Sequence, residues 1–207
     1  MGFIRILLES ACRKCAGPIV LDLVSQGSSR GAAQSEIRYD LLVMPMTKAI
    51  SVRPESPHDQ DFLLALYAST RDEELKLVPW PDAQKFAFLK MQFDLQSAHY
   101  HRHYPAASYQ IILLEDRPIG RLYVHRGESH ILLIDIALLP QHRGMGIGGQ
   151  FLGELLAEGH AAQKTVAIHV ERNNPALRLY TRLGFQIVED KGVYYYMERS
   201  PAAPDSP

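Results

Sequence analysis

The residues best suited to chemistry stand in a glycine-rich turn at positions 141–149, with the sequence QHRGMGIGG. The turn follows an apolar run at residues 131–139 that predicts a buried strand, and it precedes an amphipathic run that predicts a helix. Glycine leaves backbone N–H groups open to a close ligand, and the helix dipole adds positive potential at the same place. The turn is therefore suited to hold a phosphate group.

Two interpretations of this turn differ in the ligand that carries the phosphate. Gly144, Gly146 and Gly149 fit the G-x-G-x-x-G spacing of a dinucleotide-binding fold, with Glu171 as the acid that would bind the ribose. Residues 140–143 separate the strand from the first glycine, however, and several expected elements precede the motif. Only a helix and a hairpin are expected after the next strand, where that fold needs further parallel strands. We therefore favour a different phosphate-binding fold.

The rest of the chain predicts a mixed sheet flanked by helices, of the α/β (α+β) class. Residues 50–53 alternate as a first strand, Ser56 and Asp59 begin a helix as a capping box, and Asp82 is expected to cap a second helix. Short turns then join three strands into an antiparallel meander. A helix, a strand, a helix ended by Gly184 and a hairpin follow. The expected order is β-α-α-β-β-β-α-β-α-β-β, with a mostly antiparallel sheet.

Two separate segments carry a resemblance to a known family. Residues 141–146, QHRGMG, match the Q/R-x-x-G-x-G/A signature of the GNAT N-acetyltransferase superfamily. Residues 173–185 resemble that family's second signature, N-x-x-A-x-x-L-Y-x-x-x-G-F. One motif alone is a weak signal, but two in this order, joined by a helix and a strand, are specific. The element order is also similar to the GNAT fold, and the resemblance covers residues 50–198.

The resemblance implies acetyl-CoA as the acyl donor and an amine as the acceptor, which attacks the thioester directly. It implies that the pantetheine arm lies along the strand before the turn, where a backbone N–H near Ile136 or Ala137 stabilises the oxyanion. It also implies that amides of the turn hold the diphosphate. The cofactor-binding residues expected on this basis are Ile136, Ala137, Leu138, Gln141, Arg143, Gly144, Met145, Gly146, Ile147, Gly148, Gly149, Asn173 and Ala176.

Tyr180 matches the position of the family's usual general acid, which protonates the leaving thiolate. The alternative is a buried aromatic side chain on the core face of its helix. A base that deprotonates the amine is harder to assign. Glu128 and His130 flank the start of the central strand, and Asp135 lies inside it. These three residues are the candidates, and water-relayed proton removal is the alternative to all of them.

The acceptor site is expected where the GNAT fold places it, beside the two first helices. Trp80 and Tyr104 are the residues expected to line it, with core packing as the alternative role. His99 and His103 are spaced to share a helix face, but no cysteine or carboxylate completes a metal site there. No metal is therefore expected.

Length, charge and cysteine content narrow the classes of partner. The chain has 207 residues and a net charge of −1, so no charge excess indicates nucleic acid or a membrane surface as partner. Cys12 and Cys15 are interpreted as reduced thiols of a cytoplasmic protein. We expect a poorly ordered extension at residues 1–47, the acetyltransferase domain at 48–199 and a loose tail at 200–207. A homodimer through the carboxy-terminal hairpin and a non-catalytic acyl-CoA-binding module remain open.

Overall fold

The structure is a computed structural model that describes residues 49–201. The expected extension at residues 1–47, with Cys12 and Cys15, lies outside the described residues, as does the tail from residue 202 onward. Within residues 49–201, no helix is both long and apolar enough to cross a membrane.

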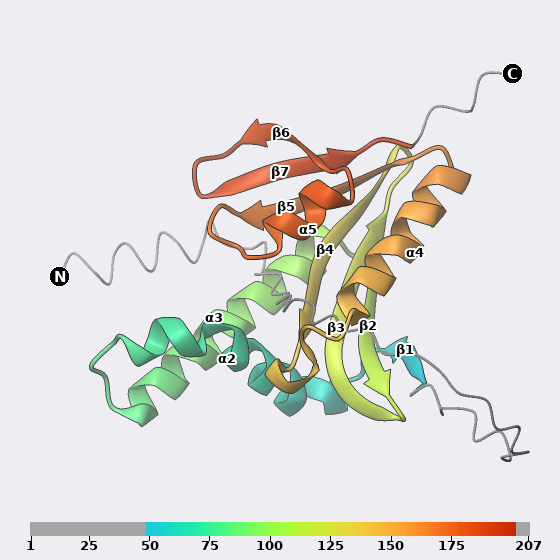
Figure 1. The fold of residues 1–207 in the computed structure, drawn as a ribbon. Helices are drawn as coiled ribbons and strands as arrows, with labels where there is room; N and C mark the ends of the chain where they lie inside the picture. The colour runs from blue at the N-terminus through green and yellow to red at the C-terminus, as the bar shows by residue number, and fades with distance from the viewer. Residues whose placement is uncertain (1–48, 202–207) are drawn as a thin grey trace, which may run out of the picture.

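The elements follow the expected order, with two short 3-10 helices added (Figure 1). The strands are β1 (Ile50–Pro54), β2 (Ser108–Leu114), β3 (Arg117–Arg126), β4 (His130–Leu138), β5 (Thr165–Glu171), β6 (Gln186–Asp190) and β7 (Tyr194–Arg199). The helices are η1 (Pro57–Asp59), α2 (Gln60–Lys76), α3 (Asp82–His103), η2 (Pro140–His142), α4 (Ile147–Ala161) and α5 (Leu177–Arg182).

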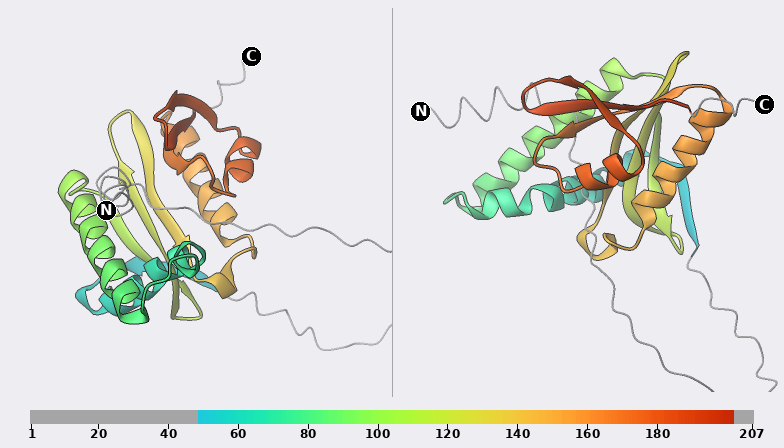
Figure 2. Two further views of the ribbon diagram at one scale, coloured as in Figure 1. Left: turned by 90° about the vertical axis from the view of Figure 1, so that its left-hand side faces the viewer. Right: turned by 45° about the horizontal axis from the view of Figure 1, so that its top comes forward.

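The described strands form one seven-stranded sheet in the order β1-β2-β3-β4-β5-β7-β6. Every neighbouring pair is antiparallel except β4 and β5, which are joined by the α4 crossover and are parallel. This topology confirms the prediction of a mixed, mostly antiparallel sheet. Helices α2 and α3 cover one face of the sheet, and α4 and α5 cover the other (Figure 2).

The central strand β4 is buried from Ile131 to Leu138 because helices lie on both of its faces. The larger core cluster lies on the α4 and α5 side and includes Leu133, Ile136 and Tyr180. Two smaller clusters lie on the α2 and α3 side. The strand that precedes the glycine turn is therefore held rigidly at the middle of the molecule.

The sequence signals for helix ends were largely sufficient. Ser56 and Asp59 form the expected capping box, and Arg53 also binds the Asp59 carboxylate with two hydrogen bonds of 2.8 and 2.6 Å. Gly184 ends α5 with a φ of 82°, as a left-handed helix cap requires. The prediction for Asp82 was wrong, because Pro81 occupies the N-cap position and Asp82 is the first residue of α3.

Gly120 in β3 is required by the close approach of β4. A Cβ at Gly120 would lie 2.3 Å from the Ala137 carbonyl oxygen, an atom that cannot move without displacing the strand. We expect Gly120→Ala to lower the free energy of unfolding by about 1–3 kcal/mol through overpacking. Urea unfolding measures this change.

Gly153→Ala is the matched control, because Gly153 lies inside α4 and a Cβ there would contact no other atom within 4 Å. Alanine has the higher helix propensity, so this variant is expected to gain about 0.5–1 kcal/mol. A Gly120→Ala protein as stable as Gly153→Ala would contradict the close approach of the two strands.

Candidate active site

Strands β4 and β5 separate halfway along their length. They pair only from His130 with Thr165 to Leu133 with Ile168. A register shift between β3 and β4 at Tyr123 and Val124 marks a β-bulge in β4 near Ile134, and a bulge bends its strand. Within the described residues, the β5-facing edge of residues 134–138 therefore has no strand partner. We call residues 134–138 of β4 and 169–171 of β5 the splayed segments; Figure 1 shows the two strands diverging there.

The glycine turn leads directly from this open edge into α4. Gly144 and Gly146 have φ angles of 71° and 82°, and Gly146 is the N-cap residue of the helix. The first main-chain bond of the helix runs from the Gln150 amide to the Gly146 carbonyl. In the described part of the chain, the amides of residues 144–149 donate to no backbone carbonyl. The turn thus presents free N–H groups at the positive end of a helix dipole.

The Arg143 side chain is engaged by hydrogen bonds within the protein. Its Nε donates to the Leu138 carbonyl at 2.8 Å, and a terminal nitrogen donates to the Ser69 hydroxyl at 3.1 Å. Its backbone N–H is also engaged, with the Pro140 carbonyl. The side chain therefore ties the turn to the end of β4 and to α2, and the free amides begin at Gly144.

Tyr180 is fully buried on α5, in the core cluster that includes Ile136 and Leu138 of β4. Its ring packs edge-on against Phe185, and its hydroxyl has no hydrogen-bond partner among the described residues. Burial raises the pKa of Tyr180 well above its ordinary value, and the negative charge of Asp135 adds to the rise. The phenol is therefore a neutral O–H group that carries its proton.

The start of α5 distinguishes two neighbouring asparagines. Asn173 is exposed, whereas Asn174 is buried. The Asn174 side-chain oxygen accepts from the Ala176 amide at 2.9 Å, and its buried Nδ2 has no partner among the described residues. Ala176 is buried against the α4 and α5 core. The polar group turned inward at this end of α5 is thus Asn174, the residue after the one that the motif indicated.

Asp135 lies at the centre of a buried polar network. Its Oδ2 accepts from Arg121 at 2.5 Å and from the Tyr100 hydroxyl at 3.3 Å, and Arg121 also donates to the Gln96 side chain at 2.8 Å. Burial raises the pKa of Asp135, and the Arg121 guanidinium opposes that rise. The second carboxylate oxygen, Oδ1, is buried without a partner among the described residues.

The structure does not bring the three candidate bases together. Glu128 is exposed in the turn before β4, and His130 is the first residue of β4, where that strand still pairs with β5. Five residues of strand separate His130 from Asp135, a distance of about 16 Å. The negative charge of Asp135 contributes to the raised pKa of Tyr180. Of the three candidate bases, Asp135 is therefore the one placed near the expected general acid.

The two expected acceptor residues are also far apart. Trp80 precedes α3 and Tyr104 follows it, and a helix of 22 residues is about 33 Å long. Trp80 packs edge-on against Phe88, and Tyr104 packs near His125. The structure therefore does not bring the two residues together, because they flank opposite ends of α3.

Sequence reasoning missed the partners of Asp135, and it considered Glu171 of the splayed segments only as the ribose-binding acid of the alternative fold. Glu171 ends β5, and one of its carboxylate oxygens is buried without a partner among the described residues. Its charge acts on the buried Arg71 of α2, which also pairs with Glu74 at 2.9 Å. The sequence signal for a buried partner of Asp135 was a charged residue inside an apolar strand, namely Arg121 between Gly120 and Leu122.

Comparisons with known proteins agree with the fold described above. Residues 64–185 match the family model described as "Acetyltransferase (GNAT) family". A solved PaiA N-acetyltransferase from Thermoplasma acidophilum, in complex with coenzyme A, aligns with a TM-score of 0.56 and 16% identity, covering 73% of this chain and 99% of that one. An acetyltransferase from Thermus thermophilus aligns with a TM-score of 0.54 and 22% identity, covering 73% and 96%. The search of curated proteins finds no match. Since the family model spans more than half of the sequence, the chain belongs to the GNAT acetyltransferase family.

Proposed function

We propose that the protein is an N-acetyltransferase that moves an acetyl group from acetyl-CoA to an amine. The observation that carries this proposal is the buried Tyr180 hydroxyl, which has no partner among the described residues and lies within electrostatic reach of Asp135. A purely structural tyrosine in a core usually has its hydroxyl hydrogen-bonded. An unpaired O–H beside the splayed segments instead has the chemistry of a proton donor.

The residues present fit the diphosphate and the pantetheine arm. The free amides of residues 144–149 would bind the diphosphate, and a Cβ at Gly146 would project into open space beside those amides. The unpaired edge of residues 134–138 offers backbone groups to an extended arm, as a further strand would use them. When bound, acetyl-CoA supplies an activated thioester carbonyl.

The chain's own groups then have separate tasks. The neutral Tyr180 hydroxyl donates its proton to the leaving sulfur. The free Oδ1 of Asp135 accepts a proton from the incoming amine, directly or through water, while Arg121 and Tyr100 hold Oδ2 in place. A free backbone N–H near residues 136–137 stabilises the oxyanion. Because Asp135 and Tyr180 belong to opposite faces of the sheet, acceptor and donor would meet between the splayed segments.

Two successive measurements test the proposal. Calorimetry with coenzyme A is expected to show binding at one site, and a panel of small amines, peptide amino termini and lysine peptides is expected to include at least one that releases free thiol from acetyl-CoA. Binding without thiol release from any amine would support the non-catalytic acyl-CoA-binding module instead. Failure to bind coenzyme A would contradict both functions.

Gly146→Ala tests the diphosphate cradle separately from turnover. Alanine at a φ of 82° costs about 1–2 kcal/mol and disturbs the amides at the helix start, so we expect coenzyme A affinity to fall about tenfold or more. Gly192→Ala is the matched control, because Gly192 has the same φ of 82° and open surroundings but lies in the β6–β7 turn. Equal losses of affinity in the two variants would contradict the cradle.

A further inference from the structure

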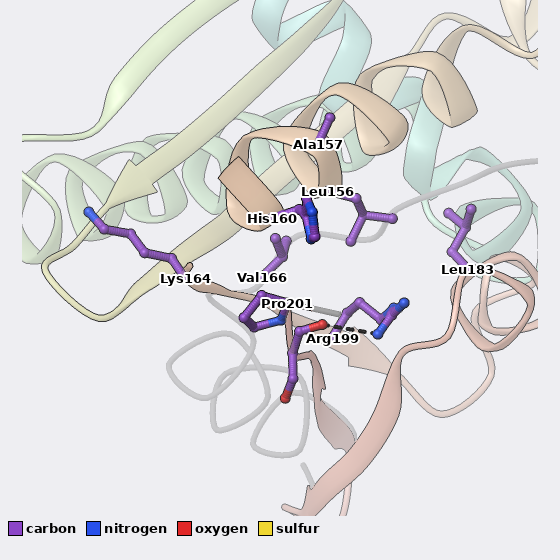
Figure 3. Close-up of a pocket in the computed structure, with 9 residues that line it drawn as sticks. Leu156, Ala157, His160, Lys164, Val166, Leu183, Arg199 and Pro201 are labelled. Atoms are coloured by element: carbon purple, nitrogen blue, oxygen red, sulfur yellow. Dashed lines mark hydrogen bonds between the residues drawn. The ribbon is translucent and has the colours of Figure 1, made fainter. Parts of the chain in front are cut away.

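A pocket of ≈ 340 Å³ lies at the end of α4 remote from the glycine turn (Figure 3). The last turn of α4, the start of β5 and the end of β7 surround it. Its lining residues are Leu156, Ala157, His160, Lys164, Val166, Leu183, Arg199, Ser200 and Pro201. Helix α4 has 15 residues, so about 22 Å separates this pocket from the proposed diphosphate site.

The lining combines an apolar wall with basic groups. Leu156, Val166 and Leu183 supply apolar surface, three lining residues are basic and none is acidic. The Lys164 ammonium group does not face the interior of the pocket. It donates to the Gly127 carbonyl at 2.9 Å and points away from the pocket in Figure 3. The same view shows the Arg199 and His160 side chains gathered with the apolar residues.

The Arg199 guanidinium is available to a ligand. Its hydrogen bond goes to the neighbouring Ser200 carbonyl at 3.0 Å, and within residues 49–201 no carboxylate pairs with it. The side chain is half-buried and held against the end of α5, where a Cβ at Gly184 would lie 2.8 Å from its Nε. A partly buried cation with no counter-charge gains strongly from an anion that accepts hydrogen bonds from it.

We infer that this pocket is a binding site for a small aliphatic carboxylate, separate from the acetyl-transfer site. The carboxylate accepts hydrogen bonds from Arg199, with His160 beside it. The hydrocarbon part lies against Leu156, Val166 and Leu183. The volume is at the lower end of the range for small-molecule sites, which suits a chain of a few carbons rather than a nucleotide.

Hexanoate and 1-hexanol are the probes, because they share the hydrocarbon chain and differ in charge. In heteronuclear NMR titrations of the full chain, hexanoate is expected to shift the signals of Leu156, Val166 and Leu183, with a dissociation constant below about 1 mM. Hexanol is expected to bind at least about tenfold more weakly, since it cannot form the charge-assisted hydrogen bonds. Saturating coenzyme A is expected to leave the hexanoate shifts unchanged.

Arg199→Gln is expected to weaken hexanoate binding at least about tenfold, because it removes the cation. Arg182→Gln is the matched control: it removes the same charge from the exposed end of α5, outside the pocket, and should bind hexanoate like the parent. His160→Gln, at an exposed position, gives a second test if the first variant does not fold. Shifts elsewhere in the protein, equal binding by the two arginine variants, equal binding of hexanol, or displacement by coenzyme A would overturn the inference.

Discussion

Tyr180→Phe is expected to lower kcat by about 10²- to 10⁴-fold, the usual contribution of a positioned proton donor. The loss follows from removing the hydroxyl that can protonate the leaving sulfur from the α5 side. Coenzyme A affinity is expected to stay within about threefold, because the diphosphate cradle and the strand edge are untouched. Thiol-release kinetics with the best amine and calorimetry with coenzyme A measure the two quantities.

The same substitution should leave the fold intact. The Tyr180 hydroxyl is buried without a partner among the described residues, so its removal abandons no hydrogen bond and is expected to be neutral or slightly stabilising. Tyr195→Phe on β7 is the control, since its partly exposed ring should tolerate the same change without loss of kcat. Equal losses of turnover and coenzyme A affinity in Tyr180→Phe would identify a structural tyrosine instead.

Local signals in the sequence were enough for the element order and for the glycine-rich turn before α4. These signals involve only residues close together in sequence, so their roles do not depend on the rest of the fold. They are the Ser56 and Asp59 pair, the left-handed Gly184 and the glycines of residues 144–149. The apolar run before the turn also identified β4 as the buried central strand. These features predict a candidate cofactor site beside the central strand.

Pairings between distant segments could not be predicted in the same way. Arg121 reaches Asp135 because the β3–β4 register sets Tyr123 opposite Asp135, and a bulge then shifts that register by one residue. Gln96 and Tyr100 join them only because α3 crosses this part of the sheet. A bulge and a helix crossing arise from tertiary packing. The sequence alone therefore does not predict on which face of the sheet the Asp135 side chain lies.

The separation of the other candidate residues has the same cause. Glu128 and His130 are close to Asp135 in sequence, but each residue of an extended strand adds about 3.3 Å to the distance between them. Trp80 and Tyr104 were grouped because both border the second helix, and its 22 residues separate them. The expected homodimer and the cytoplasmic location stay predictions.

Asp135→Asn is expected to lower the free energy of unfolding by about 3–5 kcal/mol, because it leaves the Arg121 guanidinium buried without a counter-charge. Arg121 is fully enclosed, and arginine does not lose its proton in proteins, so the cost cannot be relieved by titration. Arg121→Met leaves the opposite charge behind, but Asp135 can take up a proton. Burial already raises its pKa, and without the guanidinium the hydrogen bond from the Tyr100 hydroxyl is what still opposes the rise.

The two single variants should therefore differ in their pH dependence. A carboxyl group whose pKa is raised in the folded protein stabilises the fold below its unfolded pKa of ~3.9, and that stability is lost as the pH rises through the folded pKa. Arg121→Met is thus expected to be closest to the parent at acidic pH and to lose stability progressively toward neutral pH. Asp135→Asn has no carboxyl group at this position, so its stability lacks this contribution to the pH dependence. Urea unfolding at pH 5 and pH 8 measures both.

A double variant distinguishes the buried pair from its separate charges. Arg121→Met with Asp135→Leu removes both charges, and we expect it to recover most of the stability that Asp135→Asn loses, because apolar groups of similar volume replace the pair. Arg126 and Glu158 form an exposed ion pair at 2.7 Å, so Arg126→Met should cost no more than about 1 kcal/mol. If the double variant recovers stability yet has no acetyl transfer, the Arg121–Asp135 pair serves the reaction and is not required for the fold. If Asp135→Asn is no less stable than Arg126→Met, Arg121 and Asp135 do not behave as a buried ion pair in which each charge requires the other. That result would contradict the role proposed for the Arg121–Asp135 pair.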